Sequence, residues 1–384
     1  MDTWATSSLT PQIQSRWSLE EQRHQKLFPM DIRPQAHEII RTWAFYTIVK
    51  AWMHEGQVPW HHVVISGWIL DPDRKKMSKS KGNVVTPEGL LDEHSVDAVR
   101  YWAGRARLGT DTAFDVGMFK IGKKLATKLF NASRFVLGQI DRAQGEAGST
   151  PGNPAPGGGA AGQTASGFDL AAVTEPLDLA FLGRLRSVVD QSTAAFERFE
   201  YAVALQTTED AFWSFCDDYL ELVKSRSYAE EDTPGRRSAV ATLHAALSVF
   251  LRLLAPFLPY VTEEVWSWRL AGEGRWRSIH TAPWPEASEL APDQARSSEA
   301  IFVAASEVLG RIRGAKSEAK KSLRWPVASL AVAASKDDLA ALDVVLADVL
   351  RAGAAEGAEV RREERDAGSE RFQVLVTLGE QAAE

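Results

Sequence analysis

The spacing of apolar residues predicts helix and strand in the first part of this 384-residue chain. Residues 36–53 place large apolar side chains at roughly helical intervals, and a continuous apolar run rich in β-branched residues follows at Val63–Leu70. The first pattern predicts a helix with one buried face, and the second predicts a strand covered on both faces. A strand, a helix and a strand in this order indicate part of a doubly wound α/β sheet, in which ligands bind at the carboxyl ends of the strands.

From Met118 onward the pattern becomes that of long amphipathic helices. Apolar residues recur every three or four positions from Ile121 to Val136. Similar patterns return over 179–199, 202–228, 237–254 and 257–268. Four or five such helices predict a bundle. Residues 143–167, dense in Gly, Ala, Pro, Ser and Thr, predict a disordered insertion between the first two helices.

A third pattern follows Trp284-Pro285. It predicts a basic helix near 299–321, a strand at 327–333, a helix near 336–350 and a strand at 372–378. Such an alternation suits a small α+β region.

Composition narrows the class of protein. The length favours two or three domains, and 45% hydrophobic residues are typical of a globular chain. We find no apolar run of the roughly eighteen residues that cross a bilayer and no secretory pattern at the N-terminus, so we predict no membrane partner and a cytoplasmic location. The one cysteine, Cys216, excludes an intrachain disulfide and is predicted to be a buried helical thiol. The His and Cys spacing predicts no metal site.

The net charge of −7 disfavours nucleic-acid binding by bulk electrostatics, but two segments are locally basic. Residues 118–142 carry six cations and one acidic residue, and residues 307–325 carry six cations and two glutamates. Such segments favour a partner whose phosphates meet particular faces of the protein. Solvated helix surfaces are the alternative, and the charge pattern alone leaves both open.

One short run concentrates groups that suit a polyphosphate. The five cations between Arg74 and Lys81 have no acidic residue among them, Ser78 and Ser80 add hydroxyl donors, and Gly82 permits a sharp turn. Clustered ammonium groups stabilise the charge that develops on a triphosphate during nucleotidyl transfer. On composition alone, a solvated basic loop explains the same residues.

The order of the letters in this run adds a resemblance. Lys76-Met77-Ser78-Lys79-Ser80, followed by Lys-Gly-Asn, resembles the second ATP-binding motif of the class I aminoacyl-tRNA synthetases. Further segments resemble the valyl-tRNA synthetases in particular, and the similarity covers nearly the whole chain outside the Gly-rich insertion. These segments are Asp2–Leu9, Arg33–Trp43, Gly67–Asn83, Val96–Trp102, Leu129–Phe135 and Ala255–Trp266.

The resemblance implies roles for particular residues. Lys79 is expected to stabilise charge as pyrophosphate leaves, with Lys76 assisting. The residues expected at ATP, with its Mg²⁺, are Lys76, Met77, Ser78, Lys79, Ser80, Gly67 and Glu38. Glu38 stands where relatives commonly have an aspartate, and we expect it to accept from the ribose or the amino group. The residues expected at the valine side chain are Trp4, Ile39 and Trp43, for which core packing is the alternative reading. Those expected at tRNA(Val) are Lys120, Lys123, Lys124 and Arg134.

The same resemblance implies a domain layout. Residues 1–115 correspond to the carboxyl part of a partial Rossmann-like catalytic domain with its stem-contact region, 116–270 to an α-helical anticodon-binding bundle, and 271–384 to a small α+β C-terminal domain. The first ATP motif of the family, His-Ile-Gly-His, and the editing insertion are absent from the sequence. We therefore interpret the chain as a carboxyl-terminal portion, truncated, misstarted or paired with a separate amino-terminal half. Alone, it is expected to activate valine poorly or not at all.

Two other functions remain to be weighed. The bundle could bind tRNA while the chain catalyses no reaction, which would make the protein a binding module. An isoleucyl enzyme is a further alternative, which the pocket segments fit less well.

Overall fold

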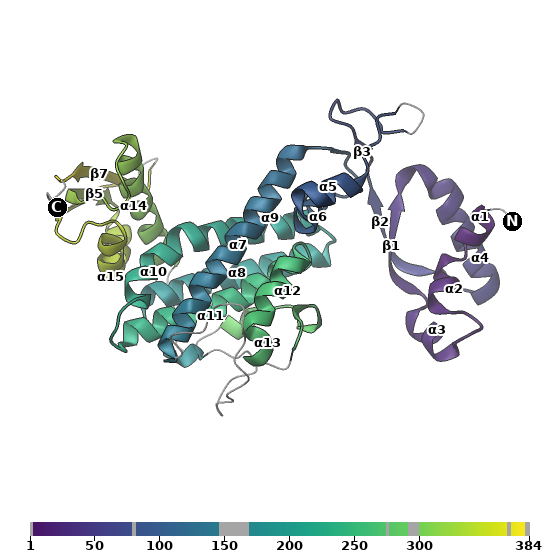
Figure 1. Cartoon of the computed structure of the whole chain (residues 1–384), viewed down its shortest axis with the longest axis horizontal. Coiled ribbons are helices and arrows are strands. Elements are labelled where there is room, and N and C mark those ends of the chain that lie inside the picture. The colour runs from purple at the N-terminus through teal and green to yellow at the C-terminus, as the bar shows by residue number, and fades with distance from the viewer. Residues whose placement is uncertain are drawn as a thin grey trace. The chain divides into compact units, whose positions relative to one another are not determined.

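The computed structural model describes residues 3–78, 82–145, 169–273, 276–290, 299–366 and 370–380. The chain divides into two compact units (Figure 1). The first comprises residues 1–122 with 195–202, and the second comprises residues 123–194 with 203–384.

The first unit begins with three short helices and a parallel strand pair. The helices are α1 (Thr3–Ser7), α2 (Thr10–Ser15) and α3 (Glu21–Leu27), and the strands are β1 (Met30–Ala36) and β2 (Trp60–Ser66). Between the strands the chain forms a 3₁₀ turn (His37–Ile39), a π-helical turn (Ile40–Ala44) and helix α4 (Phe45–Glu55). Met30 pairs with Trp60 and Ala36 with Ser66. The predicted order of strand, helix and parallel strand is therefore confirmed, but the buried face of α4 consists of Thr47 and Ala51 and not of the large apolar side chains, of which Tyr46 is 42% exposed.

The predicted strand over Val63–Leu70 differs from the structure in length and burial. It breaks at Gly67, where a Cβ atom would lie 2.3 Å from the Thr110 carbonyl oxygen, so only glycine fits. After the break, β3 (Ile69–Leu70) pairs in parallel with β4 (Thr112–Ala113). Val63 is 44% exposed, so the prediction of a strand covered on both faces is wrong. The reason is that the β1–β2 sheet has only these two strands in the described part of the chain.

The rest of the first unit packs around one aromatic cluster. Helices α5 (Pro87–His94) and α6 (Val96–Gly104) lead to the start of α7 (Val116–Ala143). The ring of Phe119 on α7 stacks on His94 at 5.3 Å and contacts Trp102 at 5.6 Å. Phe119 and Tyr101 are fully or almost fully buried, so this cluster anchors the first turns of α7.

The second unit contains the predicted bundle. Besides α7, its helices are α8 (Pro176–Glu197), α9 (Tyr201–Ser214), α10 (Leu220–Ser227), α11 (Pro234–Leu254), α12 (Pro259–Trp268) and α13 (Leu270–Glu273). The helical ranges predicted from periodicity agree closely with α7 to α12. Ala143, predicted to open the disordered insertion, ends α7 instead, and residues 146–167 of that insertion lie outside the described residues.

Helix α11 is the most buried element of the bundle. It is long and apolar enough to cross a membrane, the one such helix among the described residues, but 83% of its apolar window is buried inside the protein. We predicted no apolar run of this length; α11 reaches the required mean hydropathy although polar residues such as Thr242, His244 and Arg252 interrupt it. The burial is that of a core helix.

The predicted helix over 202–228 is continuous but contains a π-helical turn at Phe215–Tyr219, between α9 and α10. Cys216 lies in this turn and is 4% exposed. Burial raises the pKa of its thiol to about 12. The prediction of a buried helical thiol is confirmed.

The C-terminal segment forms a three-stranded sheet with two helices. α14 (Glu299–Glu318) precedes β5 (Val327–Ala334), α15 (Lys336–Ala352), β6 (Glu359–Glu364) and β7 (Phe372–Leu378). β5 is central, parallel to β6 and antiparallel to β7. The four predicted elements are present, and β6 was missed because five of its six residues are charged. Charge is usual on an edge strand, where it discourages pairing with other chains.

One cation of the second basic segment points into the core. Lys316 on α14 is fully buried, and its ammonium donates to the carbonyls of Leu323 at 2.9 Å and Gly353 at 2.6 Å. Desolvation lowers the pKa of this ammonium. The 307–325 segment is therefore less basic at its surface than its sequence indicates.

A buried ion-pair network joins the bundle to α15 within the second unit. The guanidinium of Arg226 on α10 donates to both carboxylate oxygens of Asp178 on α8, at 2.8 and 2.9 Å, and to Asp348 on α15 at 3.0 Å. Asp178 also accepts from the hydroxyls of Tyr219 at 2.7 Å and Ser238 at 2.6 Å. Burial, with the Asp178 carboxylate, raises the pKa of Tyr219 well above its ordinary value, so its hydroxyl remains a donor.

Candidate functional site

The Lys76 ammonium lies at the carboxyl end of β1. Glu38, two residues after that strand, accepts a hydrogen bond from Lys76 Nζ at 2.8 Å and another from the indole N–H of Trp68. The same ammonium lies 4.3 Å from the centre of a Trp68 ring. Three segments distant in sequence therefore place one cation at the edge of the sheet where ligands of α/β folds bind.

The pair between Lys76 and Glu38 is open to solvent. Their side chains are 49% and 41% exposed. The hydrogen bonds from Lys76 and Trp68 hold the pKa of the Glu38 carboxyl below its usual range. Because an exposed ion pair contributes little net free energy, Lys76 can exchange this carboxylate for a phosphate oxygen at small cost.

Two polar side chains, the buried Asp71 and the half-buried Asn83, contact each other across the loop that carries Lys76 and that begins after β3. Asp71, 7% exposed, accepts from the backbone N–H of Lys75 at 2.7 Å and from the Asn83 amide at 2.8 Å. The Asn83 amide also donates to the carbonyl of Lys76 at 3.3 Å, and its oxygen accepts from the Ser78 N–H at 2.9 Å. We call Asp71 and Asn83 the loop clamp. Hydrogen bonds from Asn83 and Lys75 lower the pKa of Asp71, which keeps the clamp ionised.

Sequence reasoning did not select the loop clamp. Asn83 is the last residue of the Lys-Gly-Asn sequence, and Asp71 is the first residue of the sequence Asp-Pro-Asp. Nothing in the sequence indicates that these two side chains form a hydrogen bond. Of the predicted ATP-binding residues, Lys79 and Ser80 lie outside the described residues. Lys76, Met77, Ser78, Gly67 and Glu38 are described, and the Met77 side chain is half-buried.

Replacing Asn83 by alanine is expected to loosen the loop without unfolding the protein. The change removes three hydrogen bonds that join residues 71, 76 and 78, each worth about 1 kcal/mol. Tryptic cleavage after the cations at 74–81 should then accelerate about tenfold or more. Limited proteolysis followed by mass spectrometry measures it. Asn131→Ala, on the exposed face of α7, is the control, and equal cleavage rates in both variants would contradict the role of the clamp.

The residues predicted for the amino-acid pocket come from α1 and from the turns after β1. The indole N–H of Trp43 donates to the Ser7 carbonyl at 2.9 Å. This bond ties the π-helical turn that follows Ile39 to α1, which carries Trp4. Trp4 is 41% exposed, and Trp43 and Ile39 are half-buried. All three side chains are at least partly exposed.

The predicted tRNA-binding cations lie along α7, and all four are exposed: Lys120, Lys123, Lys124 and Arg134. In the second unit, the Lys124 ammonium lies 5.2 Å from a ring of Trp213, and Lys128 lies 5.7 Å from it. Lys128 is also paired with Asp217 at 3.0 Å. Cations beside a half-buried indole suit phosphate contact with base stacking.

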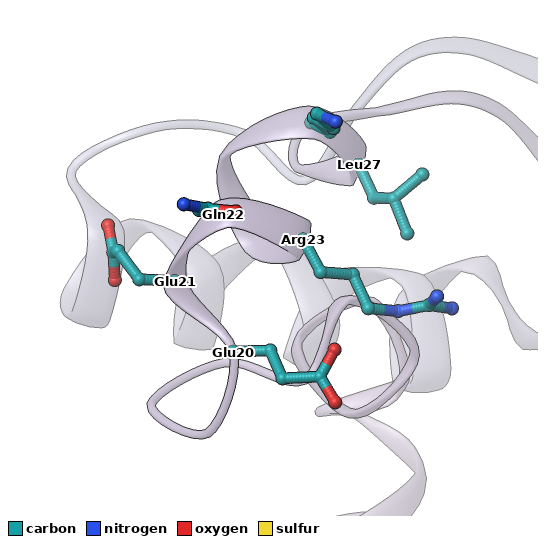
Figure 2. Close-up of a pocket in the computed structure, with 6 residues that line it drawn as sticks. Glu20, Glu21, Gln22, Arg23 and Leu27 are labelled. Carbon is teal, nitrogen blue, oxygen red and sulfur yellow. The ribbon is translucent and has the colours of Figure 1, made fainter.

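One hollow in the described part of the chain is unrelated to these residues. It has a volume of about 610 Å³ and runs along α3 (Figure 2). Its lining comes from Glu20 and α3 alone, with both signs of charge, and includes none of the predicted site residues. Within the described ranges, no group of three or more His, Cys, Asp or Glu side chains is placed to hold a metal ion.

Comparison with known families decides the classification. A model of the class I tRNA synthetases (I, L, M and V) matches residues 1–115, and one of the anticodon-binding domain of tRNA ligase matches residues 178–332. The chain belongs to the class I tRNA synthetases. Its sequence is 50% identical over 367 residues to the valine–tRNA ligase of Salinispora tropica, covering 92% of this chain and 40% of the relative. It is 49% identical over 349 residues to that of Thermobifida fusca, covering 89% and 36%.

This synthetase chain therefore spans about two fifths of the length of the curated relatives it matches. Among solved structures it resembles the ternary complex of Agrobacterium radiobacter K84 agnB2 LeuRS, tRNA and LeuAMS, with a TM-score of 0.56 and 20% identity over 75% of this chain and 33% of that one. It also resembles Mycobacterium tuberculosis methionyl-tRNA synthetase in complex with methionyl-adenylate, with a TM-score of 0.50 and 18% identity over 71% and 52%. These likenesses concern the fold.

Proposed function

We propose that this chain forms the carboxyl-terminal portion of a valine–tRNA ligase, which activates valine with ATP and transfers the valyl group to tRNA(Val). The observation that carries the proposal is the Lys76 ammonium beside Glu38 at the carboxyl edge of the sheet, in a chain half identical to valine–tRNA ligases along 92% of its length.

In the activation step, a valine carboxylate oxygen attacks the α-phosphorus of ATP and pyrophosphate leaves. Lys76 and Lys79 supply positive charge to the departing phosphates, while Met77, Ser78 and Ser80 close over the nucleotide and Gly67 allows its close approach. No covalent bond to the protein forms, so the contribution of the loop is positioning and electrostatic stabilisation. Mg²⁺ bound to the ATP phosphates would neutralise part of their charge.

Trp4, Ile39 and Trp43 are proposed to enclose the valine side chain, and Glu38 to accept from the amino group or the ribose. Glu38 is suited to this because its lowered pKa keeps it ionised and its present donor, Lys76, is exposed. An apolar pocket of this kind rejects the added hydroxyl of threonine only about a hundredfold.

The bundle is proposed to bind tRNA(Val) through Lys120, Lys123, Lys124 and Arg134. We retain the layout of a catalytic portion at 1–115, an anticodon-binding bundle at 116–270 and an α+β domain at 271–384. The ligase is proposed to be cytoplasmic.

A chimera tests the function. In it, this chain replaces the matched two fifths of the Salinispora tropica ligase, and ATP–pyrophosphate exchange and tRNA(Val) charging are measured with valine, isoleucine and threonine. Valine-dependent exchange with charging of tRNA(Val) is expected. Exchange that prefers isoleucine, or a folded chimera that binds tRNA(Val) with no exchange, would contradict the proposal. The parent Salinispora ligase is the control.

A further inference from the structure

Arg33 on β1 is a buried cation for which the described residues provide no carboxylate partner. It is 7% exposed, and its Nε donates to the Gln35 side-chain oxygen at 3.3 Å. Among the residues that the structure describes, none accepts a hydrogen bond from its buried Nη2. The guanidinium carbon lies 3.8 Å from a ring of Trp43 and 5.0 Å from a ring of Trp60. Desolvation lowers the pKa of this guanidinium, but arginine remains charged in proteins. A buried charge without a counter-ion lowers the stability of the folded state, because its desolvation is not offset by an ion pair.

A hollow of about 380 Å³ lies beside Arg33. Its walls combine apolar side chains of α2, α3 and β1, among them Pro11, Leu27 and Ile32, with the indole of Trp60. Arg23 contributes a second cation, and none of the described residues that line the hollow is acidic. The volume is in the usual range of small-ligand pockets, and a mostly apolar wall with a few charged groups is typical of them.

The hollow is separate from the proposed nucleotide site. Its β1 residues run from Met30 to Pro34, and Trp60 is the first residue of β2. The Lys76 ammonium instead pairs with Glu38, beyond the other end of β1. The roles proposed above for the nucleotide and for valine do not include Arg33, although one of the indoles beside its guanidinium, Trp43, belongs to the proposed valine pocket.

We propose that this hollow binds a carboxylate carried on an apolar body, with Arg33 as its ionic partner. A carboxylate can accept two parallel hydrogen bonds from a guanidinium, and the low dielectric between two indoles strengthens the attraction. The apolar part of the ligand would contact Pro11, Leu27 and Ile32. A free small acid and an acidic side chain of another polypeptide share this chemistry, and the test below separates them.

The first measurement compares matched acids and amides on the 384-residue chain. Phenylacetate is compared with phenylacetamide, and the capped peptide acetyl-Leu-Glu-Leu-amide with acetyl-Leu-Gln-Leu-amide, at constant chloride-adjusted ionic strength. Each acid is expected to raise the thermal midpoint saturably, by about 4 °C at tenfold excess over its Kd, and its amide to leave it unchanged. A tighter response to the peptide indicates a polypeptide source, and a tighter response to phenylacetate a free acid. Equal responses to acid and amide would overturn the proposal.

Three variants assign the response. Arg33→Met, which keeps the length of the side chain, is expected to abolish the response to both acids and to raise the midpoint of the unliganded chain, because it removes an unpaired buried charge. Arg33→Lys, which cannot bind a carboxylate bidentately, is expected to weaken binding at least tenfold and serves if the methionine variant does not fold. Arg16→Met removes an exposed arginine that does not line the hollow and should leave the response intact. An unchanged response in both Arg33 variants, or its loss in Arg16→Met, would refute the assignment.

Discussion

In a complete ligase that contains this chain, Lys79→Ala is expected to slow valine-dependent pyrophosphate exchange by about 100- to 1,000-fold. This is the usual effect of removing one preorganised donor from charge that develops in a transition state. Lys79 itself lies outside the described residues, and its role follows from the resemblance of the Lys76–Ser80 motif. Because the ammonium is proposed to act on departing pyrophosphate, kcat should fall more than the KM for ATP rises. Exchange kinetics of the Salinispora chimera measure both constants.

Lys75→Ala is the matched control for this variant. It removes the same charge from the same loop, but the Lys75 side chain is 69% exposed and pairs with Asp73 at 3.5 Å rather than with any residue of the proposed site. Its exchange rate should stay within about twofold of the parent, as is usual for an exposed surface charge. Near-normal exchange by Lys79→Ala would refute the role of Lys79. Equal slowing by Lys75→Ala would show that only the net charge of the loop matters.

The sequence predicted where this loop lies but not what holds it. The Lys-Met-Ser-Lys-Ser motif after an apolar strand predicted that Lys76 lies at the carboxyl edge of the sheet. In the structure the Lys76 ammonium donates a hydrogen bond to Glu38, which follows the carboxyl end of β1. That contact joins residues 38 positions apart, and the bond between Trp68 and Glu38 spans 30. Contacts at such separations depend on how β1 and β3 are arranged, which local periodicity does not encode. For the same reason the clamp between Asp71 and Asn83 was missed.

The fold was predicted correctly where buried residues recur at regular intervals along the sequence. Helices of the bundle pack one face inward, so α7 to α12 were found within a few residues of their ends. β6 could not be found in this way, because Val360 is its only apolar residue and its hydrogen bonds to β5 are made by the backbone. The exposure of Val63 could not be predicted either. An apolar run indicates that both faces of a strand are suited to burial, but it does not show that other parts of the same chain pack against them.

Asp178→Ala is expected to lower the free energy of unfolding of the second unit by about 3–5 kcal/mol, the usual cost of breaking a buried ion pair on one side. Asp178 is fully buried, and its two oxygens accept from Arg226, Tyr219 and Ser238. The truncation would leave the Arg226 guanidinium paired with Asp348 alone and two buried hydroxyls without their acceptor. Urea unfolding followed by far-UV circular dichroism measures the loss. Asp190→Ala, an exposed aspartate on the same helix, should change stability by no more than about 0.5 kcal/mol.

Removing the cation as well separates the cost of the stranded charge from that of lost packing. If most of the penalty comes from an uncompensated guanidinium, Arg226→Met should destabilise the Asp178→Ala protein much less than it destabilises the parent, with a coupling free energy of about 1–3 kcal/mol. The remaining loss in the double variant then reports the hydroxyls of Tyr219 and Ser238 and the cavity at Asp178. Additive effects of the two substitutions would mean that Arg226 is stabilised chiefly by Asp348 and the Gly235 carbonyl, at 3.0 and 2.9 Å. In that case α15, rather than α8, would be the main anchor of α10.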